Sequence, residues 1–134
     1  MARTRPLPQL AAGIIERFDN HVLIVLPESQ AEGARWWRFP RGPVRPGEPT
    51  EEAMRRIARE QLDLEVEIVL GQPPIVARFE DAEVELRYFF CGIIQGEPER
   101  GEYAECRWVP KGQLREYDFD DASRPVVEWL LESR

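Results

Sequence analysis

Residues 36–64 read WWRFPRGPVRPGEPTEEAMRRIAREQLDL, and they are the most informative part of the sequence. Its first half is dense in residues that restrict or free the backbone: Pro40, Gly42, Pro43, Pro46, Gly47 and Pro49. Proline fixes φ and cannot donate a backbone hydrogen bond. We therefore expect residues 40–49 to form an ordered loop of defined shape, without regular strand pairing.

The second half, Thr50 to Leu62, predicts an amphipathic helix. Thr50 is a suitable N-cap, unless Pro49 moves the boundary by one residue. At about 100° per residue, one arc of this helix is mostly apolar: Ala53, Met54, Ile57, Ala58, Gln61 and Leu62. The opposite face is charged, and its acids can be interpreted simply as solvated residues in pairs such as Glu51–Arg55. Asp63 stands where a left-handed glycine usually ends a helix.

The rest of the chain is mostly strand. Its patterns predict a hairpin from residues 10–18 and 21–26, an aromatic strand at 35–39, a strand at 65–70, a long hairpin from 75–79 and 84–94, and a strand at 105–109. Residues 111–116 predict a helical turn, and residues 120–133 an amphipathic helix. This order predicts an α+β fold in which residues 9–134 form a single domain and residues 1–8 a flexible arm.

Composition excludes several classes of function. The formal net charge of -7 argues against binding a DNA or RNA duplex, although a few arginines or a metal ion can still bind the phosphates of a nucleotide. The apolar runs are too short to span a membrane, so no membrane partner is expected. Cys91 and Cys106 form neither a disulfide framework nor a metal-ligand spacing. We expect reduced thiols and a cytoplasmic protein.

Counted from Gly42, the stretch resembles the Nudix box, which runs glycine, five residues, glutamate, seven residues, then Arg-Glu-aliphatic-any-Glu-Glu-any-Gly-aliphatic. Gly42, Glu48, Arg56, Glu60 and Leu64 fall in place, and WWRFPRG resembles the family's preceding segment. Its Arg-Gly pair is nearest the diadenosine polyphosphate hydrolase branch. The resemblance implies a MutT-like α/β/α sandwich with a mixed sheet, a central loop-helix and a C-terminal helix.

Three positions depart from that box, which has glutamate, glutamate and glycine where this chain has Ile57, Gln61 and Asp63. In the family those two glutamates, with the one matching Glu60, bind the Mg2+ or Mn2+ ion that bridges the diphosphate. A glutamine can offer a neutral carbonyl oxygen, whereas isoleucine offers no ligand. The box is therefore degenerate, with one helix glutamate of three remaining.

The resemblance also implies roles for individual residues. The candidate metal ligands are Glu60, Gln61 and Glu102, and the candidate catalytic residues are Glu60, Arg56 and Glu105. The loop residues are Gly42, Gly47 and Glu48, where Glu48 braces the loop. Arg56 can either pair with Glu48 or contact an anionic ligand. If residues 35–39 form a strand, Trp36 and Trp37 point to opposite faces, so that one enters the core and the other can stack on a base. Arg41 and Trp37 are the candidate substrate-binding residues.

Three functions compete. The first is a nucleotide- or diphosphate-binding domain with weak or lost hydrolase activity and no cofactor. The second is an active hydrolase that cleaves X–P–P–Y to X–P and P–Y with Mg2+ or Mn2+, held by Glu60, Gln61, Glu102 or Glu105. The third is a protein–protein interaction module with a vestigial cleft. The missing ligands favour the first, and a homodimer stays open in all three.

Overall fold

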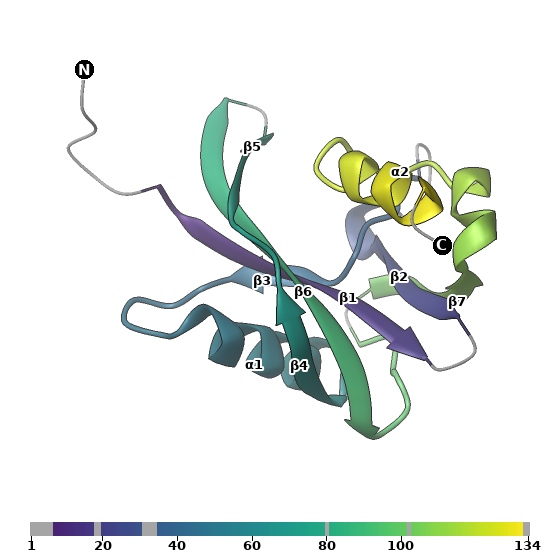
Figure 1. Ribbon diagram of the computed structural model, residues 1–134, viewed down its shortest axis with the longest axis horizontal. Helices are drawn as coiled ribbons and strands as arrows, with labels where there is room; N and C mark the ends of the chain where they lie inside the picture. The colour runs from purple at the N-terminus through teal and green to yellow at the C-terminus, as the bar shows by residue number, and fades with distance from the viewer. Residues whose placement is uncertain (1–6, 18–19, 31–34, 80, 102, 133–134) are drawn as a thin grey trace.

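The computed structural model describes residues 7–17, 20–30, 35–79, 81–101 and 103–132. These residues form a mixed seven-stranded sheet between two helices (Figure 1). The strands are β1 Gln9–Arg17, β2 His21–Pro27, β3 Arg41–Pro43, β4 Glu65–Gly71, β5 Ile75–Phe79, β6 Ala82–Gln95 and β7 Tyr103–Pro110. The helices are α1 Thr50–Leu62 and α2 Arg124–Glu132, with 3-10 turns η1 Glu28–Gln30 and η2 Lys111–Glu116. The predicted α+β sandwich with a central loop-helix and a C-terminal helix is confirmed.

Strand β1 lies at the centre of the sheet, whose order is β4-β6-β1-β2-β7. On one side β1 pairs in parallel with β6, from Gln9 to Glu16. On the other side its first half pairs with β3 and its last residues pair with β2, both antiparallel. Strand β5 extends the long β6 as a hairpin. This arrangement holds β3, and with it the start of the loop, against the middle of the sheet.

Alternation along the strands divides the core into two layers. The layer under α1 contains Ala11, Leu23, Val25, Phe89 and the buried helix residues Ala53, Met54, Ile57, Ala58 and Leu62. The layer under α2 contains Ala12, Ile24, Tyr88 and the helix residues Val127 and Leu130. Within the described residues, neither helix has the length and hydropathy needed to cross a bilayer.

The expectation of an unpaired loop is wrong at its start, because Arg41–Pro43 form β3. Pro40 precedes this short strand and Pro43 ends it, so that the missing N–H groups interrupt little pairing. The predicted strand at residues 35–39 is also wrong. Trp37 and Arg38 form single bridges to two different partners, Phe119 and Val25, and no continuous ladder follows.

Helix α1 begins one residue earlier than a Thr50 N-cap would give, and α2 begins four residues later than residue 120, where the sequence predicted it. Pro49 is the N-cap of α1, and the Thr50 hydroxyl accepts a hydrogen bond from Arg87 instead of capping the helix. Helix α2 begins at Arg124 because the Asp120 carboxylate accepts the Ser123 N–H at 3.0 Å and closes a turn before it. Most of the predicted arm, residues 1–6, lies outside the described residues, and Pro8 accepts a hydrogen bond from the Glu85 N–H.

Asp63 ends α1 in the left-handed conformation, with φ 57 and ψ 39, and its N–H bonds to the carbonyls of Ala58 and Arg59. An L side chain is strained in this region, and glycine is not. We predict that Asp63→Gly raises the free energy of unfolding by about 0.5–1 kcal/mol. Urea unfolding measures this change. Asp63→Ala should lower the free energy of unfolding, and equal stability of the two variants would contradict the prediction.

Candidate functional site

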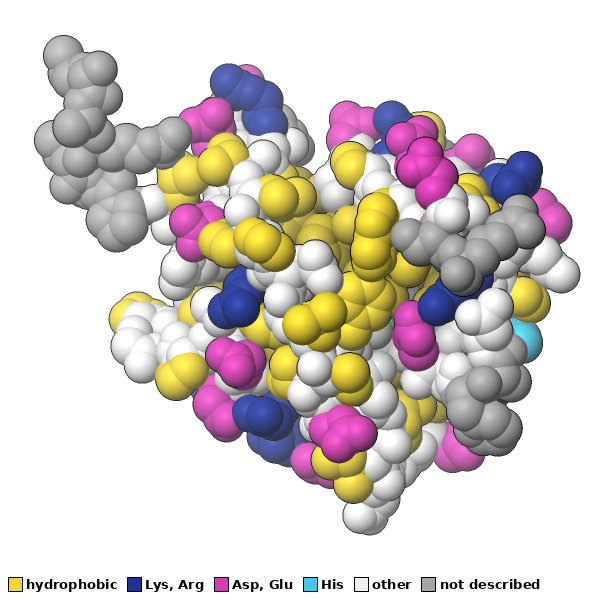
Figure 2. All heavy atoms as spheres, viewed as in Figure 1, with side chains coloured by type: hydrophobic (Ala, Val, Ile, Leu, Met, Phe, Trp, Pro, Cys, Tyr) yellow, Lys and Arg dark blue, Asp and Glu magenta, His cyan; other side chains and the backbone are white. Residues whose placement is uncertain are grey.

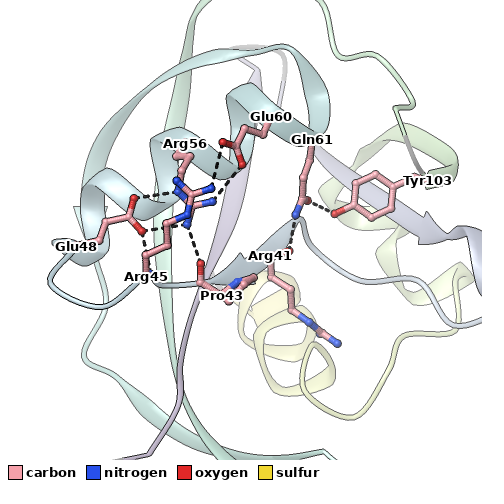
Figure 3. A network of polar contacts seen from close by, with 8 residues as sticks. All are labelled: Arg41, Pro43, Arg45, Glu48, Arg56, Glu60, Gln61 and Tyr103. Atoms are coloured by element: carbon pink, nitrogen blue, oxygen red, sulfur yellow. Dashed lines mark hydrogen bonds and ion pairs between the residues drawn. The ribbon is translucent and has the colours of Figure 1, made fainter.

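Arg56 holds the loop of residues 40–49 against α1 (Figure 3). Its Nε and Nη2 donate to the two carboxylate oxygens of Glu48 at 2.9 and 3.0 Å, and Nη2 also donates to the Pro43 carbonyl at 2.8 Å. The Arg45 N–H donates to the same carboxylate at 3.0 Å. These contacts confirm that Arg56 pairs with Glu48 and that Glu48 braces the loop.

The remaining glutamate of the helix, Glu60, is an exposed carboxylate between two arginines. Arg56 Nη1 donates to its Oε1 at 3.2 Å, and Arg45 Nη2 lies 3.6 Å from its Oε2. The Glu60 side chain is 52% exposed. Its charge is therefore partly balanced by arginines of the loop and the helix, in solvent.

Ile57 and Gln61 stand at the other two positions where the family has metal-binding glutamates. Both side chains point inward, toward the loop. Ile57 is 1% exposed and packs in the layer between α1 and the sheet. A Cβ atom added to Gly42 would lie 3.1 Å from Ile57 Cγ1 and 3.2 Å from Gln61 Nε2. Glycine thus allows the loop backbone to approach α1 closely, and the side chains of Ile57 and Gln61 fill the space between them.

Gln61 forms a neutral hydrogen-bond bridge that suits an amide and not a carboxylate (Figure 3). Its Nε2 donates to the Arg41 carbonyl at 3.1 Å, and its Oε1 accepts the hydroxyl of Tyr103. A carboxylate can only accept hydrogen bonds when ionised, so a glutamate here would face the Arg41 carbonyl as a second acceptor. The bridge is therefore complementary to glutamine.

The residues present do not fit a divalent metal ion. Mg2+ and Mn2+ prefer several oxygen ligands with carboxylate charge. Ile57 provides no oxygen, both polar ends of the Gln61 amide are engaged, and Glu60 is paired with arginines. Over the described part of the chain, no three acidic, histidine or cysteine side chains gather into a possible metal site. Glu102 lies outside the described residues.

Glu105 lies on the opposite face of the sheet from Glu60. It pairs in the sheet with Leu26, a member of the α2-side layer, and its Oε1 accepts Arg107 Nη2 at 2.7 Å. It also forms an ion pair with Arg35. Directly opposed residues of an antiparallel pair share a face. The structure therefore does not bring the two proposed catalytic acids together.

The two candidate substrate-binding residues are both largely buried. Trp37 is 5% exposed, and its ring contacts Tyr117 edge-on at 5.5 Å and the Arg107 guanidinium at 5.2 Å. Its assignment as the base-stacking tryptophan is therefore wrong, because its ring faces are covered; Trp36 is the exposed one. Arg41 pairs with Asp120 at 2.8 Å and points toward α2, away from Gln61 (Figure 3). Burial lowers the pKa of Arg41, and Asp120 opposes this shift.

A hollow of about 320 Å³ lies between the β5–β6 hairpin and α2, where Figure 2 shows hydrophobic side chains gathered on the surface. Its lining comprises Ile14, Gln72, Pro73, Ile75, Tyr88, Pro125, Val126 and Trp129. Small-molecule pockets are typically this size and mostly apolar. Sequence reasoning missed Trp129, which is 44% exposed. The available signal was an aromatic residue at the edge of the apolar arc of the predicted last helix.

We predict a pH dependence of stability from the Glu48 brace. Hydrogen bonds from Arg56, and then from the Arg45 N–H, lower the pKa of Glu48 to about 2. The unfolded chain has the ordinary value of about 4.3. The carboxylate therefore contributes stability above pH ~4.3 that is lost as the pH falls toward 2. Urea unfolding should show Glu48→Gln less stable than the parent at pH 6, with the difference shrinking through this window.

The control for that measurement is Glu128→Gln, on the exposed face of α2. Its free energy of unfolding should equal that of the parent at every pH. A difference for Glu48→Gln that is constant from pH 6 to pH 2 would show that its carboxylate is not selectively stabilised in the folded state.

Comparison with known proteins supports the fold described above. The NUDIX domain family matches residues 7–130. The 8-oxo-dGTP diphosphatase of Escherichia coli (strain K12) is 27% identical over 122 residues, which cover 91% of this chain and 95% of that protein. A structure of MutT, from a study of Aliivibrio salmonicida and Vibrio cholerae, has a TM-score of 0.73 at 25% identity, covering 95% of this chain and 98% of that one.

The MutT NUDIX hydrolase of Burkholderia pseudomallei has the same fold, with a TM-score of 0.79 at 22% identity, covering 92% of this chain and 97% of that one. These relatives do not test the likeness of the Arg41-Gly42 segment to the diadenosine polyphosphate hydrolases, which stays a prediction. The family match spans both core layers, the loop and α1. The chain belongs to the NUDIX domain family and is MutT-like.

Proposed function

We propose that this domain binds a nucleotide or another diphosphate-containing small molecule and has weak or no metal-dependent hydrolase activity. The observation that carries the proposal is that uncharged side chains occupy the positions where the family has metal-binding carboxylates. Ile57 is buried against Gly42, and Gln61 bridges the Arg41 carbonyl and the Tyr103 hydroxyl. Loss of charged oxygen ligands removes most of the affinity for a hard cation.

The hollow beside α2 supports the binding half of the proposal. Its walls carry two aromatic side chains, those of Tyr88 and Trp129, and the polar side chain of Gln72. Trp129 lies 5.4 Å from the Phe90 ring, a contact that supports the indole from one side. An apolar pocket with few polar groups is the usual form of a small-molecule site. The family relation supports a nucleotide as its ligand.

Two observations favour the second candidate, an active hydrolase. The Glu60 carboxylate is half exposed, and the Escherichia coli relative is a diphosphatase. In that case Mg2+ or Mn2+ would be the cofactor of this chain. The cytoplasmic location and a homodimer stay predictions from the sequence in either case.

The first test is turnover. We predict that the purified protein hydrolyses dinucleoside polyphosphates, nucleotide sugars and nucleoside triphosphates at or near the uncatalysed rate, with either Mg2+ or Mn2+. Chromatography of the products measures this. Turnover by the parent that is lost in Glu60→Gln would establish the active hydrolase and overturn our preference. Ligand-induced shifts of the melting temperature report binding independently of turnover.

The second test restores the missing charges. We predict that Ile57→Glu combined with Gln61→Glu is less stable than the parent in EDTA by about 3 kcal/mol, because it places carboxylates where the structure packs apolar and neutral groups. It should bind Mn2+ by calorimetry, and Mn2+ should raise its melting temperature, whereas the parent should show neither effect.

The matched control is Ile57→Gln, which introduces polarity without charge and should gain no affinity for Mn2+. If the double glutamate variant folds and shows no greater affinity for Mn2+ than the parent, α1 is not a disabled metal site. The protein–protein interaction module would then become the better interpretation.

A further inference from the structure

The turn that joins β4 to β5 forms one wall of the hollow beside α2, through Gln72 and Pro73. Both strands pair with β6, and the turn lies along the same strand. The Gln72 N–H donates to the Tyr88 carbonyl at 2.9 Å. Pro73 and Pro74 have no N–H to donate, so they cannot continue this pairing. The position of the wall therefore depends on side chains that reach the turn from outside it.

Arg87 of β6 holds this turn against the start of α1. Its Nε donates to the Gln72 carbonyl at 2.9 Å, and its Nη1 donates to the Thr50 hydroxyl at 3.0 Å. The guanidinium carbon lies 4.8 Å from the centre of the Phe89 ring. A Cβ atom added to Gly71 would lie 2.7 Å from Nη2, so the glycine allows this close approach. One side chain thus connects the wall of the hollow to the first residue of α1.

Arg87 touches the wall from behind, and it is not among the described residues that line the hollow. It pairs in the sheet with Ala11, a member of the layer under α1, whereas Ile14 and Tyr88 of the other layer line the hollow. The turn lies at the edge of the sheet, where its backbone carbonyl is reached from the α1 face. Arg87 is therefore placed to set the position of the wall without touching a ligand.

Two physical effects follow from this contact. A wall that is already fixed costs less to order when a ligand binds. A hydrogen bond from a charged donor is also stronger than one from a neutral donor, so Arg87 holds the Gln72 carbonyl firmly. Because the same guanidinium bonds to Thr50, a displacement of the turn changes a contact of α1. A contact shared in this way is the physical requirement for coupling between two places in a protein.

We propose that Arg87 is a positioning residue for the ligand hollow, which holds the wall formed by Gln72 and Pro73 and couples ligand binding to the start of α1. This inference rests on the proposed function, since the hollow is the ligand site of that proposal. It connects the hollow on one face of the sheet to the loop-helix unit on the other face.

The test titrates the full chain with ADP by calorimetry, with and without Mg2+. We expect Arg87→Met to weaken ADP binding by about fivefold or more, as for a typical coupling between two sites. Arg87→Lys should lie between Arg87→Met and the parent, because lysine keeps the charge without the planar fork that holds both partners. The matched control is Arg78→Met, which removes the same charge from an exposed position on β5 and should bind as the parent does.

Thr50→Val tests the connection to α1, because it removes the hydroxyl that accepts from Arg87 Nη1. It should weaken ADP binding less than Arg87→Met does, and it should have no further effect when Arg87→Met is already present. Additive effects of the two substitutions, or no effect of Thr50→Val alone, would overturn the coupling to α1.

Two readouts separate positioning from a merely structural role. A structural role would lower the melting temperature of Arg87→Met without ligand and leave the ADP affinity of the folded protein unchanged. Coupling predicts in addition that ADP slows amide hydrogen exchange at Ala53 and Met54 in the parent, and not in Arg87→Met. Titrations are made below the melting temperature of each variant, and Arg87→Lys and Thr50→Val carry the same test if Arg87→Met does not fold.

The other outcomes are distinct. ADP affinity that is equal in the parent and in Arg87→Met overturns the inference and leaves the proposed function standing. ADP affinity that is unchanged in Trp129→Ala would show that ADP binds outside the hollow, which overturns both the inference and the hollow as the ligand site. If ADP does not bind the parent with or without Mg2+, the proposed nucleotide-binding function fails for this ligand and the inference fails with it.

Discussion

The ion pair between Arg56 and Glu48 is the interaction on which the loop-helix unit depends. Both side chains are largely withdrawn from water, at 13% and 16% exposure, and the contact is bidentate. Such a pair is stronger and more directional than an ordinary surface ion pair. Because Arg56 also binds the Pro43 carbonyl, it fixes both ends of the loop to α1. The loop in turn continues into β3, which pairs with the central strand β1. One arginine thus connects the middle of the sheet, the loop and the helix.

That connection explains how this chain keeps the family's backbone although Ile57 and Gln61 replace two of the family's glutamates. Gly42 comes so close to α1 that the side chains at positions 57 and 61 must fit against it. Isoleucine does so by apolar packing, and glutamine by donating to one neighbour and accepting from another. Neighbouring carboxylates without a cation would repel one another and lose hydration. In a chain without a metal, the neutral pair is therefore the more stable filling of this space.

The sequence predicted the fold because periodicity and turn residues report local structure. Residues 50–62 formed a helix as expected, and the pairing of Arg56 with Glu48 is one of the two alternatives that the sequence left open for Arg56. Sequence reasoning failed where partners that are distant in sequence determine the local structure. Residues 35–39 looked like a strand, but their backbone bonds go to Val25 on one side and Asp118 on the other. Trp37 and Trp36 could not be assigned to core and surface without that geometry. The amide bridge of Gln61 was equally invisible, because its partners Arg41 and Tyr103 are distant in sequence.

Membership of a family fixes the backbone of a site more strongly than its electrostatics. In this chain Glu48 of the loop and Glu60 of α1 are each contacted by arginine, and Asp120 balances Arg41. Arg38 is left uncompensated among the described residues, in a protein whose formal net charge is -7. A divalent cation at Glu60 would have to compete with the guanidinium groups of Arg45 and Arg56. The family's backbone is thus retained in this chain, while the carboxylates that remain on it are already paired with arginines.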